Sequence, residues 1–141
     1  MTDQSKLNTT ILLLVSDRLV RSVIGETLER EGYMVVPAGD LGSAVDWLKE
    51  STPDLLITRS YVSDMEGHEA AKYLQTKCHA MRVLILGGLL DDHRLQYREE
   101  IAGFEIFPKA YPAAQLIEKV KQVLATIRGG TQDQRLNVAK K

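Results

Sequence analysis

The sequence predicts an α/β domain built on one parallel sheet, and two features of the chain support this fold class. Short apolar runs alternate with longer segments in which apolar residues recur every three or four positions. Five such pairs follow one another along the 141 residues. Wholly apolar runs are typical of strands that are covered on both faces, and their alternation with helices favours a parallel arrangement.

The first two pairs show the pattern most clearly. Residues 11–15 read Ile-Leu-Leu-Leu-Val, which we expect to form a buried strand. From Leu19 to Glu31 the apolar residues recur at helical spacing, and Gly32 is placed to end that helix. The second pair has an expected strand at residues 33–36 and a helix that Asp40 can cap at its N-terminus.

The third to fifth pairs repeat this arrangement. Their expected strands are residues 55–58, 82–86 and 105–107, and their expected helices are residues 67–77, 91–101 and 112–127. A loop is expected at residues 59–66. Right-handed crossovers between five strands favour a flavodoxin-like, doubly wound (βα)5 fold, in which the parallel sheet has the strand order 2-1-3-4-5. In such a sheet the functional site lies at the carboxyl ends of the strands.

The domain is expected to span residues 9–127. The polar residues 1–8 and the stretch 128–141, which contains Gly129 and Gly130 and little apolar content, are expected to be flexible termini. No second domain is predicted.

Composition excludes several classes of function. The hydrophobic fraction of 44% is sufficient for a core, and the formal net charge of -1 gives no basic excess that would indicate nucleic acid as a partner. The apolar runs are too short to cross a bilayer, so no membrane partner is expected. A single cysteine, Cys78, cannot form an internal disulfide and is consistent with a cytoplasmic protein.

The segment from Pro53 to Gly67 carries a resemblance to a known family. It reads Pro-Asp, a four-residue strand, Arg59, a short loop and then Asp-Met-Glu-Gly. This spacing is similar, without a gap, to the third-strand segment of bacterial response-regulator receiver domains (CheY-like), which have an aspartate at the position of Arg59. Ser16-Asp17 stands where the family has an acidic pair, Gly87-Gly88 where it has a hydroxyl and a small residue, and Lys109-Ala110-Tyr111 where it has lysine, proline and an aromatic residue.

The resemblance implies a module of two-component or phosphorelay signalling whose phosphorylation chemistry is altered. A working receiver holds magnesium with three carboxylates and phosphorylates one of them. Of the three only Asp17 remains, and a guanidinium about 4 Å from a divalent ion would experience ~8 kcal/mol of gross repulsion at an effective dielectric of 20. We therefore expect a pseudo-receiver with no magnesium or other metal, no cofactor and no catalytic residue, which is not an enzyme and acts independently of phosphorylation.

The residues of this vestigial phosphorylation pocket are expected to be Ser16, Asp17, Arg59, Gly87, Gly88 and Lys109. Arg59 and Asp17 should lie close together. Their pairing has two interpretations: a fixed positive charge that locks one signalling state, or a structural ion pair that fills an unused pocket. Ser16, Ser60 and Asp64 are weaker candidates for an alternative phosphate acceptor, since none stands at the end of a strand in the required position.

A protein is the expected partner: a kinase, an output protein or another receiver. The family uses its fourth helix, fifth strand and fifth helix for output and dimerisation, so a homodimer through this surface is possible. Candidate anchors on this surface are Leu95, Tyr97, Ile106, Phe107 and Tyr111. The alternative function is a small flavodoxin-like enzyme or ligand-binding protein that uses the pocket at the strand ends. An Arg59–Asp17 contact would favour the first function, and an open cleft with an anion beside Arg59 the second.

Overall fold

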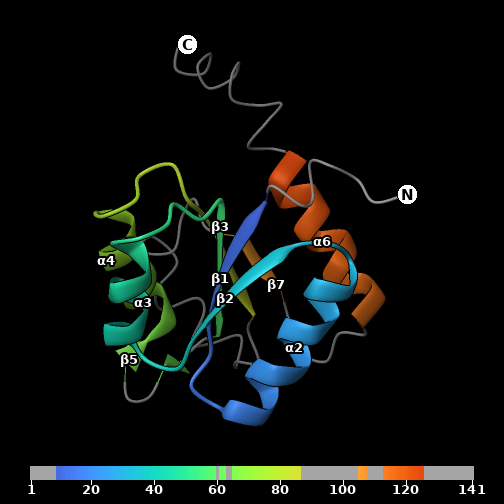
Figure 1. Ribbon diagram of the computed structural model, residues 1–141, viewed down its shortest axis with the longest axis horizontal. Helices are drawn as coiled ribbons and strands as arrows, with labels where there is room; N and C mark the ends of the chain where they lie inside the picture. The colour runs from blue at the N-terminus through green and yellow to red at the C-terminus, as the bar shows by residue number, and fades with distance from the viewer. Residues whose placement is uncertain (1–8, 60, 63–64, 87–104, 108–112, 126–141) are drawn as a thin grey trace.

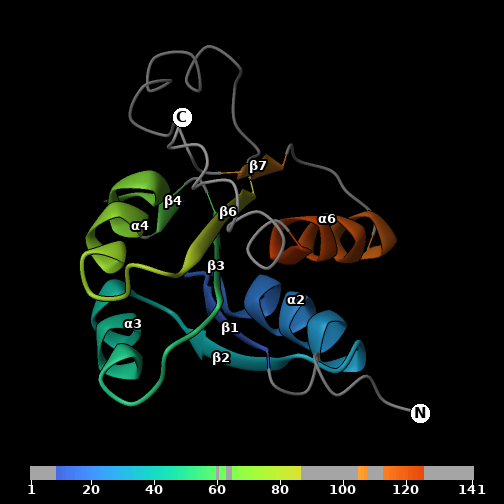
Figure 2. The ribbon, with the colours of Figure 1, turned by 90° about the horizontal axis from the view of Figure 1, so that it is seen from above.

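A parallel sheet forms the centre of the molecule, and helices cover both of its faces (Figures 1 and 2). The computed structural model describes residues 9–59, 61–62, 65–86, 105–107 and 113–125. The sheet has the order β2-β1-β3-β6-β7, and all of its neighbouring strands are parallel. Its strands are β1 (Thr10–Leu14), β2 (Met34–Ala38), β3 (Leu55–Arg59), β6 (Arg82–Leu86) and β7 (Glu105–Phe107). The predicted order is confirmed for the first four strands, and β7 lies beside β6, where the fifth strand is expected.

The helices of the described residues lie on both faces of the sheet (Figure 2). Helices α2 (Arg18–Arg30) and α6 (Ala113–Ala125) pack on one face, and α3 (Leu41–Leu48) and α4 (Gly67–Gln75) pack on the other. Each face has its own apolar core, because successive side chains of a strand point to opposite sides of the sheet. Ile11, Leu13 and Val15 belong to the α2/α6 core, whereas Leu12 and Leu14 belong to the α3/α4 core.

Strand β3 follows the same alternation, which decides the side on which Arg59 emerges. Leu55 and Ile57 lie in the α2/α6 core and Leu56 lies in the α3/α4 core. Arg59, two residues after Ile57, therefore continues the row that faces α2 and α6.

Two side-chain hydrogen bonds join β1 to β3, one near each end of the pair. The Thr10 amide donates to the Asp54 carboxylate at 3.0 Å. At the carboxyl end, the hydroxyl of fully buried Thr58 donates to the Leu14 carbonyl oxygen at 2.9 Å. These bonds hold the register in which Leu14 lies opposite Thr58.

The helix boundaries agree with the capping signals. The Asp40 carboxylate accepts the Ser43 amide at 2.8 Å at the start of α3, as predicted, and this bond lowers the pKa of Asp40. Gly32, just after α2, has a φ of 100°, in the left-handed region that glycine adopts without strain.

The predicted loop at residues 59–66 is wrong in part. Strands β4 (Tyr61–Val62) and β5 (Met65–Glu66) pair in an antiparallel hairpin within it. Buried Val62 belongs to the α3/α4 core, with Met65 packed against that core, so tertiary packing fixes the hairpin. Strands of two residues are too short to produce a periodic pattern in the sequence.

The apolar stripe of α2 is wider than the surface that the helix buries. Ile24 and Leu28 are buried, but Leu19 and Val23 are 72% and 56% exposed. The helical spacing therefore predicts the helix correctly and its buried face only in part.

Several expected features lie outside the described residues. They are the termini 1–8 and 128–141, the helix at residues 91–101 and the start of the last helix at Pro112. Across the part of the chain that the structure describes, none of the helices has the length and apolar character needed to cross a membrane.

We predict that replacing Thr58 with valine destabilises the fold by about 1–3 kcal/mol, because it leaves the buried Leu14 carbonyl without its hydroxyl donor. Urea unfolding followed by circular dichroism measures this loss. Thr27→Val is the matched control, since the Thr27 hydroxyl donates only to the Val23 carbonyl of its own helix near the surface. Equal losses in the two variants would contradict a special role for Thr58.

Candidate functional site

Arg59 occupies the carboxyl end of β3, at the middle of the sheet. It lies opposite Leu86 of β6, and continuing the β1–β3 register by one residue places Val15 on its other side. Val15 and Leu86 are buried in the α2/α6 core, whereas Arg59 is half-buried. The start of α2 and the β5 end of the hairpin lie at this same edge, which is the lower edge of the sheet in Figure 1.

Asp17 lies at this edge but does not pair with Arg59. Its carboxylate accepts the Val20 amide at 3.0 Å and caps the N-terminus of α2, and its side chain is exposed. The predicted Asp17–Arg59 ion pair is therefore wrong. The physical reason is competition, because the unpaired amides at a helix start attract a carboxylate that stands at the cap position.

The guanidinium of Arg59 makes no hydrogen bond or ion pair with any of the described residues. Arg59 as a whole is half-buried, so its charge stands at this edge without a counter-charge from the described residues.

Arg21 is a residue of this edge that the sequence did not indicate. Its Nη1 donates to the Val15 carbonyl at 2.7 Å and, more weakly, to the Ser16 carbonyl at 3.5 Å. Its guanidinium also lies against Gly39, where a β-carbon would be 3.0 Å from Nη1. Arg21 thus fixes the turn between β1 and α2, on the β2 side of the sheet. No periodicity distinguishes it from other polar residues of the helix.

The charges at this edge do not resemble those of a cation site. Its carboxylates are engaged away from Arg59, because Asp17 and Asp40 cap α2 and α3 and Glu66 lies beside His68. The guanidinium groups of Arg59 and Arg21 add positive charge to the same edge, while Ser16 is neutral and exposed. Within the described ranges, no cluster of three or more histidine, cysteine or acidic side chains could hold a metal ion. Gly87, Gly88 and Lys109, the other predicted pocket residues, lie outside the described residues.

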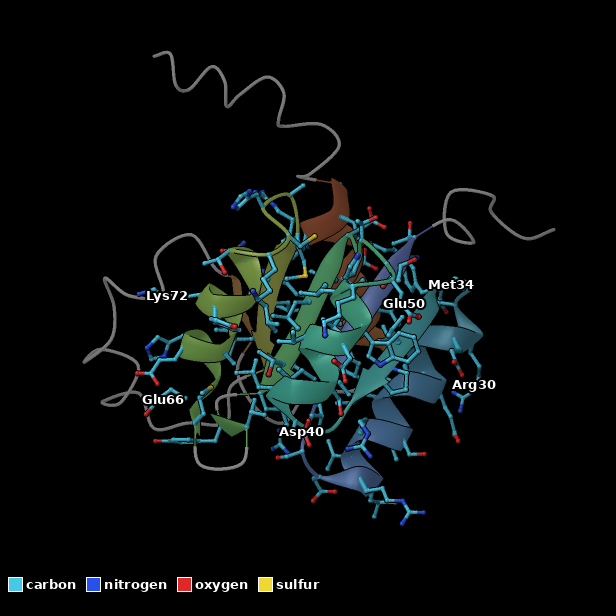
Figure 3. All side chains as sticks on the ribbon, turned by 60° about the vertical axis from the view of Figure 1, so that its left-hand side comes forward. Arg30, Met34, Asp40, Glu50, Glu66 and Lys72 are labelled. Carbon is cyan, nitrogen blue, oxygen red and sulfur yellow. The ribbon has the colours of Figure 1, made fainter. Side chains whose placement is uncertain are left out.

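His68 is buried at the start of α4, which the sequence did not indicate. Its Nδ1 lies 3.8 Å from Oε1 of Glu66, a residue labelled in Figure 3. This contact lies where the β4–β5 hairpin passes into α4.

The structure describes only part of the predicted partner surface. Ile106 and Phe107 belong to β7, but Leu95, Tyr97 and Tyr111 lie outside the described residues. The large exposed apolar side chains that the structure does describe lie elsewhere: Leu19, Val23, Met34, Trp47, Tyr61 and Tyr73.

Trp47 is held at the surface beside β2. Its indole nitrogen donates to the Pro37 carbonyl at 2.9 Å. Trp47, Ser43, Asp46 and Glu50 line a shallow hollow of about 300 Å³ on α3. This hollow is on the α3/α4 side of the sheet and does not belong to the strand-end site.

Known proteins share the fold of this chain. The profile of the response regulator receiver domain matches residues 11–121. The chain belongs to this family. Receiver domains are modules of two-component and phosphorelay signalling, so this chain is a module of that kind of signalling.

Similar proteins agree with this assignment. Sporulation initiation phosphotransferase F of Bacillus subtilis is 25% identical over 80% of this chain and 92% of its own length. The transcriptional regulatory protein CpxR of Escherichia coli is 27% identical over 88% of this chain but 53% of its own length. The chain thus spans nearly the whole of the first relative and about half of the second.

Solved structures share the fold. A CheY-like receiver domain from Methanospirillum hungatei has a TM-score of 0.75 at 21% identity, over 85% of this chain and 96% of the other. A receiver protein from Sinorhizobium medicae has a TM-score of 0.72 at 22% identity, over 84% and 96%.

We predict that Arg21→Met lowers the free energy of unfolding by about 1–3 kcal/mol, because the Val15 carbonyl loses a charged donor. Urea unfolding again measures the change. Arg30→Met is the control: Arg30 is exposed in the last turn of α2, so its loss should cost under about 1 kcal/mol. A smaller effect at Arg21 than at Arg30 would show that the contact to Val15 does not hold the turn.

We also predict slow modification of Cys78. Desolvation by burial raises the pKa of this thiol, so less of the reactive thiolate is present at a given pH. Alkylation by iodoacetamide at mildly alkaline pH should be slower in the folded protein than in urea. Equal rates in the two conditions would contradict the prediction.

Proposed function

We propose that this receiver domain signals through protein contacts and is not phosphorylated at the carboxyl end of β3. The observation that carries the proposal is Arg59 itself, which stands as the last residue of β3 between the ends of β1 and β6. A guanidinium is a cation without a nucleophilic lone pair, so it cannot attack a phosphoryl group.

The surrounding charges support the same conclusion. Magnesium prefers several hard oxygen ligands in octahedral geometry. Asp17 is the one carboxylate of the predicted pocket, and its carboxylate already caps α2. A divalent ion placed beside Arg59 would meet a permanent positive charge, which costs ~8 kcal/mol of gross repulsion at about 4 Å and an effective dielectric of 20.

The proposed partner is a protein: a histidine kinase, an output protein or another receiver. One relative is named a sporulation initiation phosphotransferase, which makes a phosphorelay component a reasonable partner here. Without an acceptor of its own, the domain would bind such a component as a competitor of working receivers. Homodimerisation through the predicted surface with Leu95, Tyr97, Ile106, Phe107 and Tyr111 is part of the same proposal.

A ligand-binding function is the second candidate. One observation favours it, namely the lack of a counter-charge for Arg59 among the described residues. No described arrangement of side chains favours an enzyme over a binding module.

The test of the proposed function is exposure to a small acyl phosphate with magnesium, followed by intact-mass measurement. We predict no added phosphoryl group. Magnesium with beryllofluoride, the combination in a solved structure of the regulator TrrA of Thermotoga maritima, should leave the amide spectrum unchanged. Phosphorylation of the wild-type chain, or saturable shifts around Asp17 with this mimic, would disprove the proposal.

The double variant Ser16→Asp with Arg59→Asp tests whether restoring the missing carboxylates restores magnesium binding. These changes supply two more carboxylates beside Asp17, so magnesium binding should appear or strengthen. A pull-down from the native cell with both proteins then separates the two interpretations of Arg59. Unchanged partner capture by the variant indicates a vestigial pocket, whereas lost capture indicates that Arg59 sets the binding state.

A further inference from the structure

We propose that Arg59 anchors a metal-independent site for a phosphate-type oxyanion, either inorganic phosphate or a small phosphomonoester. The site lies at the carboxyl edge of the sheet, between the ends of β1 and β6. The proposal rests on the proposed function in one respect: it requires that no magnesium ion occupies this edge.

The first argument is the rigid placement of Arg59. Its neighbours in the sheet, Val15 and Leu86, are buried in the α2/α6 core, and Arg59 continues the row of strand residues that faces this core. The preceding residue, Thr58, is fully buried and bonded to β1. The apolar stem of Arg59 therefore starts from a fixed backbone, and its charged end is held at the rim of the core.

The second argument is the lack of a counter-charge. Asp17 accepts the Val20 amide, and no ion pair joins Arg59 to any residue that the structure describes. A bound anion would therefore supply the guanidinium with the charged partner that the described residues do not provide. The planar fork of a guanidinium matches two oxygens of a phosphate or carboxylate.

Arg21 gives the third argument. By holding the Val15 and Ser16 carbonyls, it keeps the turn between β1 and α2 in the conformation in which Asp17 caps the helix. It also adds a second positive charge at the same edge. Beside Arg59, a doubly charged phosphate is favoured over a singly charged carboxylate, since Coulomb attraction scales with charge.

The experiment titrates the isolated protein with inorganic phosphate, phosphoserine or acetate, in a metal chelator and at constant ionic strength. Binding is followed by backbone amide shifts. We expect saturable shifts of residues around Arg59 with phosphate and phosphoserine, and weaker binding of acetate.

Three variants make the test specific. Arg59→Gln should weaken phosphate binding by at least about tenfold, the effect of losing charge-assisted hydrogen bonds. Arg59→Lys keeps the charge but not the fork, so its affinity should be intermediate. Arg82→Gln is the matched control, because Arg82 is an exposed arginine at the opposite end of the neighbouring strand β6, paired with Leu55; its affinity should stay within about twofold of the wild type.

Three results would overturn the inference. They are phosphate binding that does not saturate, equal losses in Arg59→Gln and Arg82→Gln, and acetate binding as tight as phosphate. Phosphate binding that appears only when magnesium replaces the chelator would overturn the proposed function as well, because it would show a working cation site. Failure of phosphate to bind in either condition overturns this inference alone.

Discussion

The parallel pairing of β1 with β3 is the interaction on which the rest of the structure depends. Its register is held near both ends, by the Thr10 amide on the Asp54 carboxylate and by the Thr58 hydroxyl on the Leu14 carbonyl. A shift of one residue would exchange the side chains that face the two cores, because successive residues of a strand point to opposite faces. The same register sends Arg59 out at the carboxyl edge, on the side covered by α2 and α6. The position of the candidate site is therefore a consequence of core packing.

The charge of that edge follows from a competition between local interactions. Asp17 stands directly before α2, where a carboxylate is strongly favoured by the helix amides, and it is held there rather than beside Arg59. Arg21 fixes the same turn through the Val15 carbonyl. The described carboxylates of this edge are engaged away from Arg59, since Asp17 and Asp40 cap helices and Glu66 lies beside His68. Arg59 adds a permanent positive charge without a counter-charge among the described residues, which disfavours a divalent metal and links the proposed lack of phosphorylation to the proposed affinity for an anion.

The scaffold and the site are physically separable, which explains how a receiver fold can be retained with such different functional residues. Leu55, Leu56 and Ile57 of β3 fill the two cores, and none of them contributes a polar group to the edge. Arg59 comes after them, at the rim, where a long charged side chain can reach solvent with its polar end. Exchange of residues at the rim therefore leaves the apolar packing that determines the fold largely unchanged.

The sequence by itself determined the fold class, the order of the first four strands and the caps at Asp40 and Gly32, because these depend on local periodicity and on hydrogen bonds between near neighbours. It also placed Arg59 at a strand end, since a strand, a loop and the spacing around them are contiguous in the chain. Only the tertiary structure decided that Arg21 binds the Val15 carbonyl, that Val62 anchors a hairpin and that His68 is buried. Each of these depends on which of several possible partners lies nearest in space, and that choice is made by the packing of helices on the sheet rather than by the spacing of residues.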